Sequence, residues 1–190
     1  MDVKIGMTKD GIITAGEAHL RYQGGAFPNG TVEMGAQSAF AAYDLKAVRT
    51  KGWNVLTNRP KQAAYRAPGA PQAIYAVESV VDELCQKLNL DPLEIRIKNA
   101  AKKGTKSSYG PTFDDIGLIA TLEAAKKHPH YLAPLEENQG RGLSCGFWFN
   151  FGGDTCVTLN VNFDGTIGVT EGNPDIGGSR ASISQMAAEE

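Results

Sequence analysis

The sequence Ala63-Ala64-Tyr65-Arg66-Ala67-Pro68-Gly69-Ala70-Pro71-Gln72 predicts a sharp turn that leads into a helix. Pro68 fixes its own φ angle and Gly69 tolerates a positive one, so the turn is stiff and tightly bent. Pro71 suits the first helical position, where its missing N–H costs nothing. Because helix N-termini attract negative charge, Arg66 and the neighbouring amides form a candidate anion site. The alternative is an ordinary turn in which Arg66 pairs with a local carboxylate.

The residues after this turn carry one apolar stripe at helical spacing, which predicts a long core helix. Asn89 is expected to end this helix. Asp91 and Pro92 then suit the cap and first position of a second helix, and Glu94 can reach back to the cap. The stripe consists of Ile74, Val77, Val81, Leu84 and Leu88, with Val80 beside them.

The residues before the turn predict a hairpin, a helix and a short strand. Residues 3–8 and 12–20 alternate in polarity around a Lys-Asp-Gly turn, which is typical of a β-hairpin. A moderately amphipathic helix is expected over residues 31–46. A short strand over 53–57 then leads into the turn.

The C-terminal part of the chain is predicted to be richer in strands. A helix is expected to begin at Asp114 or Asp115, and the Pro-rich, polar segment 131–140 is the candidate linker. Residues 155–163 and 167–170 alternate around an Asp-Gly turn and predict a second hairpin.

These elements together predict an α+β fold in two parts. Residues 1–130 form an N-terminal hairpin and a helix-rich part, and residues 141–190 form a β-hairpin layer followed by a truncated helix. Because a fold that ends in a truncated helix leaves apolar surface exposed to solvent, self-association of the chain is expected.

Composition excludes several classes of function. The 190 residues carry a formal net charge of −2 with both signs interspersed, so nothing indicates a nucleic-acid partner. No apolar run approaches the roughly 20 residues of a membrane span. The cysteines Cys85, Cys145 and Cys156 are odd in number and form no Cys-x-x-Cys pair, which favours three buried free thiols and a cytoplasmic location.

A second glycine-rich turn follows the C-terminal hairpin, at residues 172–179. Gly177 and Gly178 allow a ligand to approach the backbone, and the helix that follows offers N–H donors. The segment matches neither common nucleotide-binding glycine pattern. A purely structural turn is the alternative.

Three segments in register resemble the molybdenum-binding subunit of the xanthine dehydrogenase and aldehyde oxidase family. They are the AFRGFGGPQ-like loop 64–72, the helix segment 78–84, and the DP-x-E-x-R-x-KN segment 90–99. The resemblance implies that Tyr65, Arg66 and Ala67 lie next to a molybdenum–pyranopterin cofactor. Ala64 and Gly69 are then supporting residues.

The diglycine turn resembles the family's second cofactor loop, of D/E-[IM]-G-Q-G type, through Asp175-Ile176-Gly177. Gly178 stands where the family has glutamine, and Ser179 stands where it has glycine. The amide side chain that would bind the cofactor is therefore missing, while Gly177, Gly178 and Ser179 can still offer donors. The first loop also departs from the pattern, because Ala67-Pro68 replaces glycine followed by an aromatic residue.

The resemblance implies a parent enzyme that hydroxylates an aldehyde or N-heterocycle with oxygen from water. Its electrons leave through iron–sulfur clusters and FAD on other domains or subunits. The expected glutamate base lies beyond Glu190, so the chain contains no catalytic residue and no metal ligand. As part of a large subunit, the chain alone is expected to bind no cofactor and to be inactive. A non-catalytic α+β binding module and a simple anion-binding domain are the alternatives.

Overall fold

A computed structural model describes residues 1–149, 154–175 and 177–190 of the chain. These residues form two compact units, Met1–Trp148 and Phe149–Glu190, each of which is described by itself. The boundary falls after the segment 131–140, which the sequence predicts as a linker. Part of that segment is helical, since α5 spans Pro129–Leu132.

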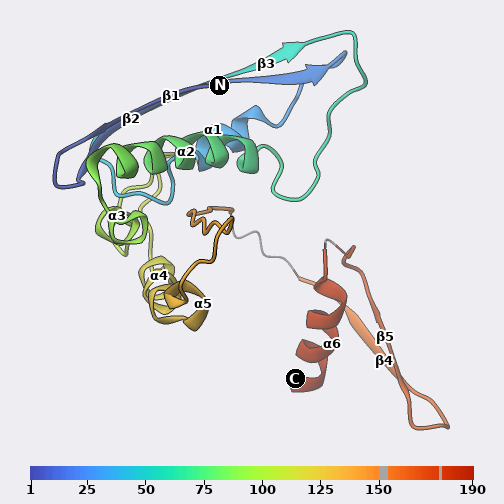
Figure 1. The fold of residues 1–190 in the computed structure, drawn as a ribbon. Coiled ribbons are helices and arrows are strands. Elements are labelled where there is room, and N and C mark those ends of the chain that lie inside the picture. Colours follow the sequence, from blue (N-terminus) through green and yellow to red (C-terminus); the bar gives the residue numbers. More distant parts are fainter. Residues whose placement is uncertain (150–153, 176) are drawn as a thin grey trace. The chain divides into compact units, whose positions relative to one another are not determined.

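A three-stranded sheet forms one layer of the first unit (Figure 1). Strands β1 (Asp2–Met7) and β2 (Ile13–Gly25) pair antiparallel, which confirms the N-terminal hairpin. Strand β3 (Val48–Leu56) pairs parallel with β2, giving the order β1-β2-β3. It starts earlier than the predicted strand at 53–57, because pairing with β2 extends it.

The crossover between β2 and β3 contains a shorter helix than the sequence predicts. Helix α1 spans only Val32–Ser38, so the prediction of a helix over 31–46 is wrong beyond that point. The four residues from Phe40 to Tyr43 are all buried. A helix presents only one face to a core, so this run turns instead, and Tyr43 forms a β-bridge with Ala100.

Helix α2 (Ala70–Leu88) lies against the sheet and confirms the long core helix (Figure 1). The centre of its buried stripe is Ala73, Val77, Val81 and Cys85, each fully buried. Asn89 ends the helix in a left-handed conformation, as predicted. Helix α3 (Pro92–Asn99) follows, and the Asp91 side chain accepts from the N–H groups of Leu93 and Glu94 at 2.8 and 2.9 Å.

Helix α4 (Leu118–Lys127) begins later than predicted. Neither Asp114 nor Asp115 caps it, because the chain before it forms a tight loop and Asp115 pairs with Lys103 at 3.1 Å. The carboxylate of Glu94 does not close a capping box. It pairs with Lys126 of α4 at 2.5 Å, which links α3 to α4.

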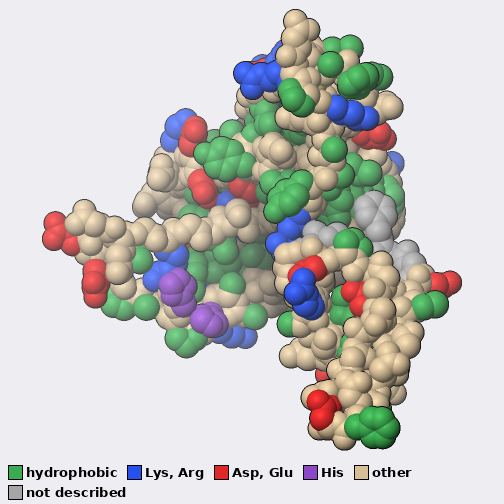
Figure 2. Space-filling view, turned by 90° about the vertical axis from the view of Figure 1, so that its right-hand side faces the viewer, with side chains coloured by type: hydrophobic (Ala, Val, Ile, Leu, Met, Phe, Trp, Pro, Cys, Tyr) green, Lys and Arg blue, Asp and Glu red, His purple; other side chains and the backbone are tan. Residues whose placement is uncertain are grey.

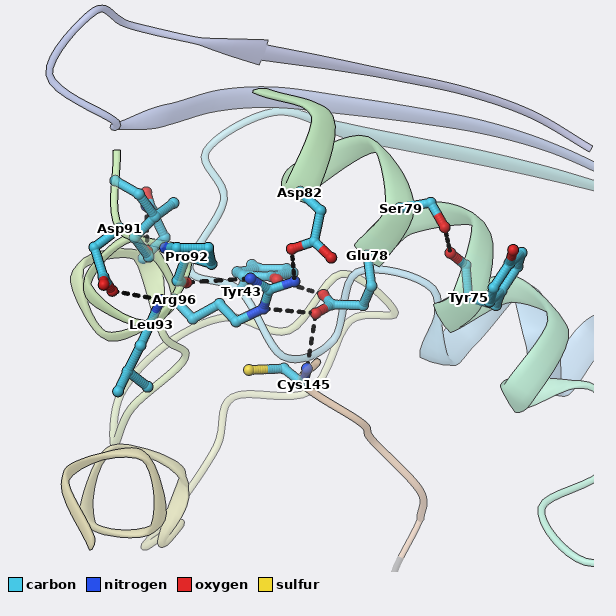
Figure 3. A network of polar contacts seen from close by, with 12 residues as sticks. Tyr43, Tyr75, Glu78, Ser79, Asp82, Asp91, Pro92, Leu93, Arg96 and Cys145 are labelled. Carbon is cyan, nitrogen blue, oxygen red and sulfur yellow. Dashed lines mark hydrogen bonds and ion pairs between the residues drawn. The ribbon is translucent and has the colours of Figure 1, made fainter. Parts of the chain in front are cut away.

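A buried polar network joins α2 and α3 (Figure 3). Glu78 Oε2 accepts from Arg96 Nε at 2.8 Å and from the Cys145 backbone N–H at 2.7 Å. Glu78 Oε1 accepts from the Tyr43 hydroxyl, and Arg96 Nη2 donates to Asp82 at 2.8 Å. Burial and the adjacent Glu78 carboxylate raise the pKa of Tyr43 well above its usual value. Four separate stretches of chain are thereby joined at one buried carboxylate.

Asn99 fastens the end of α3 to the N-terminal hairpin. Its Oδ1 accepts from the Ile13 N–H, and its Nδ2 donates to the Gly11 carbonyl, both at 2.8 Å. Gly11 has φ 84°, and a Cβ there would lie 2.1 Å from the Ile95 side chain. The hairpin turn is therefore packed directly on α3.

The second unit contains β4 (Val157–Val161), β5 (Ile167–Glu171) and α6 (Ser179–Glu189). The two strands pair antiparallel, which confirms the second hairpin. The α+β class is confirmed.

The cysteines are only partly as predicted. Cys85 and Cys145 are buried free thiols, but Cys156 is exposed, so the prediction of three buried thiols is wrong. Cys156 directly precedes β4, whose residues are all exposed in this unit.

Charges of both signs are interspersed on the face shown in Figure 2, with hydrophobic side chains between them. Within the described residues, no helix combines the length and apolar character needed to cross a membrane.

Replacing Arg96 by leucine is expected to lower the free energy of unfolding of the first unit by about 3–5 kcal/mol, because the buried Glu78 carboxylate loses its charged partner. Lys87→Leu, which removes an exposed pair with Glu83, is the matched control and should cost less than about 1 kcal/mol. Urea unfolding followed by circular dichroism measures both. Equal, small losses would contradict the importance of the network.

In the folded chain, Ellman's reagent is expected to label one thiol, that of Cys156, at pH 8. Burial, followed by the nearby Glu78 carboxylate, raises the pKa of Cys145 to about 11, and burial also raises the pKa of Cys85. Both buried thiols therefore stay protonated and inaccessible at pH 8. Cys156→Ser should abolish fast labelling, and denaturant should restore two reactive groups in that variant.

Candidate functional site

The Arg66 turn has a strained backbone. Arg66 and Ala67 adopt φ angles of 32° and 53°, and Gly69 adopts 86°. Positive φ is unfavourable for residues with a Cβ and persists only where the surroundings enforce it. Such strain concentrates at functional sites, so the turn is a stronger candidate than its sequence alone indicates.

The side chains of this turn face solvent. Arg66 is exposed, and Tyr65 keeps 89% of its surface accessible. No described residue forms a hydrogen bond or ion pair with the Arg66 guanidinium. The local carboxylate partner of the alternative interpretation is therefore not found in the part of the chain that the structure describes.

Backbone hydrogen bonds from the end of β2 hold the segment that precedes the turn. Thr57 N–H donates to the Gly25 carbonyl at 3.0 Å, and Gln62 N–H donates to the Gly24 carbonyl at 3.2 Å. Between them, Ala26 N–H donates to the Arg59 carbonyl at 2.9 Å. The approach to Arg66 is thus fixed on the sheet.

The other end of the turn is held by Tyr22 of β2. Its buried hydroxyl donates to the Gly69 carbonyl at 2.6 Å, and burial raises the pKa of Tyr22 to about 12. Gly35 of α1 also lies here, and a Cβ on it would be 2.6 Å from the Tyr22 hydroxyl and 2.7 Å from the Gly69 carbonyl. A Cβ on Gly69 itself would lie 2.0 Å from the Thr31 carbonyl. Only glycine fits at either position.

The N-terminus of α2 opens directly from this turn. Its N-cap is Gly69, and no side chain caps it, so its first amides keep no side-chain acceptor. A cavity of about 370 Å³ lies beside the first turns of the helix, with Pro71, Tyr75 and Glu78 in its wall. The Ala70 N–H donates to the Ala67 carbonyl at 3.1 Å and Pro71 has no N–H, so the donor at this turn that suits an anionic group is the Arg66 guanidinium.

The diglycine turn is built differently. Gly177 and Gly178 have φ angles of 79° and 103°, and α6 starts at the next residue. The Asp175 carboxylate accepts from Gly178 N–H at 3.0 Å and from the Ser179 hydroxyl at 3.2 Å. The Gly178 hydrogen bond is the largest cause of the lowered pKa of Asp175. The Asp175 carboxylate therefore occupies the Gly178 N–H, which the sequence analysis expects to bind a ligand. Ile176 lies outside the described residues.

The structure brings the first group of predicted site residues together but does not relate them to the second. Ala64, Tyr65, Arg66, Ala67 and Gly69 lie in the first unit, whereas Gly177, Gly178 and Ser179 lie in the second. A joint site formed by both turns stays a prediction.

Sequence reasoning missed Tyr22 and Gly35, which hold the turn in place. Tyr22 and Gly35 are far from the Arg66 turn in the sequence. Tyr22 also fits the ordinary alternation of buried and exposed residues along strand β2, so nothing singles it out. Phe147 and Trp148 lie at the end of the first unit. Phe147 packs with Tyr109 and Phe113, with ring centroids 5.6 and 5.9 Å away. Among the described residues, no cluster of three or more His, Cys, Asp or Glu suits a metal ion.

Comparison with known proteins identifies the class. The sequence profile of the molybdopterin cofactor-binding domain matches residues 1–100, and the chain belongs to this family. The matched region contains β1 to α3 and the whole Arg66 turn.

Individual relatives are longer than this chain. It is 33% identical to the aldehyde oxidoreductase of Megalodesulfovibrio gigas over 184 residues, which cover 89% of this chain and 20% of that protein. It is 29% identical to the xanthine dehydrogenase molybdenum-binding subunit of Escherichia coli O157:H7, covering 100% of this chain and 28% of the relative. The chain therefore spans less than a third of either relative.

Solved structures of aldehyde oxidoreductases have a similar fold. The aldehyde oxidoreductase from Desulfovibrio gigas superposes with a TM-score of 0.64 at 30% identity, covering 88% of this chain and 20% of that chain. The aldehyde oxidoreductase from Desulfovibrio desulfuricans gives 0.67 at 27% identity, with 85% and 19% covered. The fold and the sequence thus point to the molybdenum-binding region of molybdenum hydroxylases.

Tyr22→Phe is expected to lower the free energy of unfolding by about 1–3 kcal/mol, because the buried Gly69 carbonyl loses its donor. Faster hydrogen exchange should appear at residues 61–70 and not at β1. Gly35→Ala should speed exchange there as well, because its new Cβ meets the same carbonyl. Gly117→Ala, whose Cβ would meet no atom within 4 Å, is the control and should leave exchange in this segment unchanged. Unaltered exchange in the first two variants would show that these contacts do not hold the turn.

Proposed function

We propose that this chain supplies part of the molybdopterin-binding site in the large subunit of a molybdenum hydroxylase. Tyr65, Arg66 and Ala67 lie next to the cofactor in this proposal, and Ala64 and Gly69 support them. The observation that carries it is the exposed Arg66 guanidinium, which has no described partner and stands in a strained turn at an uncapped helix N-terminus. That turn lies inside the region matched by the family profile.

A second part of this binding site would come from the second unit. Residues 1–130 then end the first molybdopterin-binding half, 131–140 link the halves, and 141–190 begin the second. Gly177, Gly178 and Ser179 contribute donors to the cofactor. The Asp175 carboxylate would have to release the Gly178 N–H for that contact.

The parent enzyme would oxidise an aldehyde or N-heterocycle in the cytoplasm, together with iron–sulfur and FAD domains or subunits. When bound, the molybdenum–pyranopterin group supplies the redox chemistry that introduces oxygen from water. The role of this chain is to bind and orient that group. Arg66 neutralises negative charge on it, and the anchored turn keeps the guanidinium in place. The glutamate base is supplied by a segment other than these 190 residues.

A specific observation favours a second candidate, a non-catalytic binding module on the same scaffold. Gly178 replaces the glutamine of the second cofactor loop, and its N–H is already bonded to Asp175. In that case the large subunit would hold no molybdenum at all.

Arg66→Ala in the large subunit that carries these residues is expected to lower its molybdenum content about 10- to 100-fold, because a charge-assisted contact is worth about 1.5–3 kcal/mol. Arg66→Lys should retain part of the metal, since lysine keeps the charge without the planar fork. Arg59→Ala, in the same segment, is the matched control and should keep full occupancy. Inductively coupled plasma mass spectrometry measures the metal.

Molybdenum content unchanged by Arg66→Ala would contradict the role of Arg66. Absence of molybdenum from the unmodified large subunit would favour the module instead. The 190-residue chain alone should contain no stoichiometric molybdenum and reduce no dye acceptor, and stoichiometric metal with turnover would refute the assignment as part of a larger site.

A further inference from the structure

The segment 141–147 lies near the end of the first unit and has no helix or strand assignment. Its residues nevertheless alternate in burial, as they would along an extended strand. The odd-numbered residues are buried or partly buried, and both Leu143 and Cys145 belong to the hydrophobic core or pack against it. The even-numbered residues are small and exposed, namely Gly142, Ser144 and Gly146. The segment is therefore docked on the first unit through every second residue.

Side-chain contacts hold both ends of this segment. At its start, the Arg141 guanidinium lies 5.6 Å from the centroid of the Tyr131 ring in α5, and its Nη2 donates to the Ala133 carbonyl at 2.6 Å. At its end, the Phe147 ring packs with two aromatic rings of the loop that precedes α4. The two ends are thus held by different parts of the first unit.

Between these ends, one backbone hydrogen bond fixes the segment. The Cys145 N–H donates to Glu78 Oε2 of α2 at 2.7 Å (Figure 3). No other backbone group of residues 141–146 forms a hydrogen bond with a described residue. Cavities of about 420 and 370 Å³ both have Gly142 and Leu143 in their walls, so this part of the segment is not closely packed. The hydrogen bond to Glu78 is therefore the main polar contact at the centre of the segment.

The surroundings of Glu78 orient this acceptor. Arg96 Nε donates to the same oxygen at 2.8 Å, and the Tyr43 hydroxyl donates to the other oxygen, so the carboxylate is held in one rotamer. A hydrogen bond to a carboxylate is stronger than one between neutral groups. The Glu78–Arg96 pair thus does more than join α2 to α3, because it presents a fixed acceptor to a backbone N–H 67 residues further along the chain.

We propose that Glu78 is a positioning residue for cofactor binding, a role that rests on the proposed function. Its carboxylate holds the segment 141–147 on α2, and the chain continues through Trp148 into the second unit, which carries the diglycine turn. One helix then serves both parts of the proposed binding site. Its N-terminus supports the Arg66 turn, and Glu78, about two turns further along, fixes the point at which the chain leaves the first unit.

Trypsin cleavage after Arg141 tests the hydrogen bond in the 190-residue chain. Cys145→Pro removes the N–H that donates to Glu78, and Cys145→Ala keeps it and is the matched control. Cleavage should be about 10- to 100-fold faster in the proline variant than in the alanine variant, because the protease acts when the segment leaves the first unit. Cleavage after Lys61 is the internal reference and should not change. Circular dichroism establishes that both variants are folded, and equal cleavage after Arg141 in the two folded variants overturns the proposal.

Molybdenum content tests the positioning role in the large subunit that carries this chain. Cys145→Pro should lower the molybdenum content about tenfold, whereas Cys145→Ala should retain it. Unchanged molybdenum in the proline variant, together with faster cleavage after Arg141, overturns the role of Glu78. The proposed function fails by a different result, which is unchanged molybdenum in Arg66→Ala, so the two failures are distinguishable.

A pair of insertions in the large subunit tests the same role without the proline variant. A short glycine–serine stretch is inserted either after Glu137, in the exposed loop before the docked segment, or between Trp148 and Phe149, after it. The first insertion should leave the molybdenum content unchanged, because docking fixes the segment whatever the length of the loop before it. The second should lower the content severalfold, because a longer flexible connection lowers the effective concentration of the diglycine turn. Any result other than a loss confined to the second insertion overturns the proposal.

Discussion

The buried carboxylate of Glu78 is the interaction on which the first unit depends. One oxygen accepts from Arg96 and from the Cys145 backbone, and the other accepts from Tyr43 (Figure 3). Arg96 is fully buried and also reaches Asp82 and the Pro92 carbonyl. An isolated charge in such a place is very costly, so the pair is stable only because each group is bonded on several sides. This requirement holds α2 and α3 in one arrangement.

The same helix connects that network to the candidate site. α2 carries Glu78 in its interior and starts at the Arg66 turn, so a fixed helix gives the turn a fixed support. Tyr22 and Gly35 hold the junction from the other side, through the Gly69 carbonyl. The strained backbone at Arg66 and Ala67 is therefore held by contacts on both sides, at residues 57–62 and at Gly69. The arrangement suits a site that must present a cation without rearrangement.

Local chemistry explains which features were predictable. The two hairpins, the Asn89 and Asp91 helix ends and the sharp turn follow from residues close in sequence, and the structure agrees. Features that depend on residues far apart in the sequence could not be predicted. Phe40 to Tyr43 leave the helix because the core surrounds them, and Tyr22 meets Gly69 across 47 residues of chain. The Glu78–Arg96 pair belonged to a recognisable motif, but its structural role emerged only when the two helices were placed side by side.

The central claim is that the Arg66 guanidinium binds an anionic group of a pterin cofactor. It is tested most directly by an experimental structure of the cofactor-loaded large subunit that carries this chain. The expected result is a phosphate or other anionic oxygen of the cofactor within hydrogen-bond distance of Arg66, with the backbone of residues 65–69 unchanged. An Arg66 side chain paired with a protein carboxylate, and a cofactor bound elsewhere, would contradict the account.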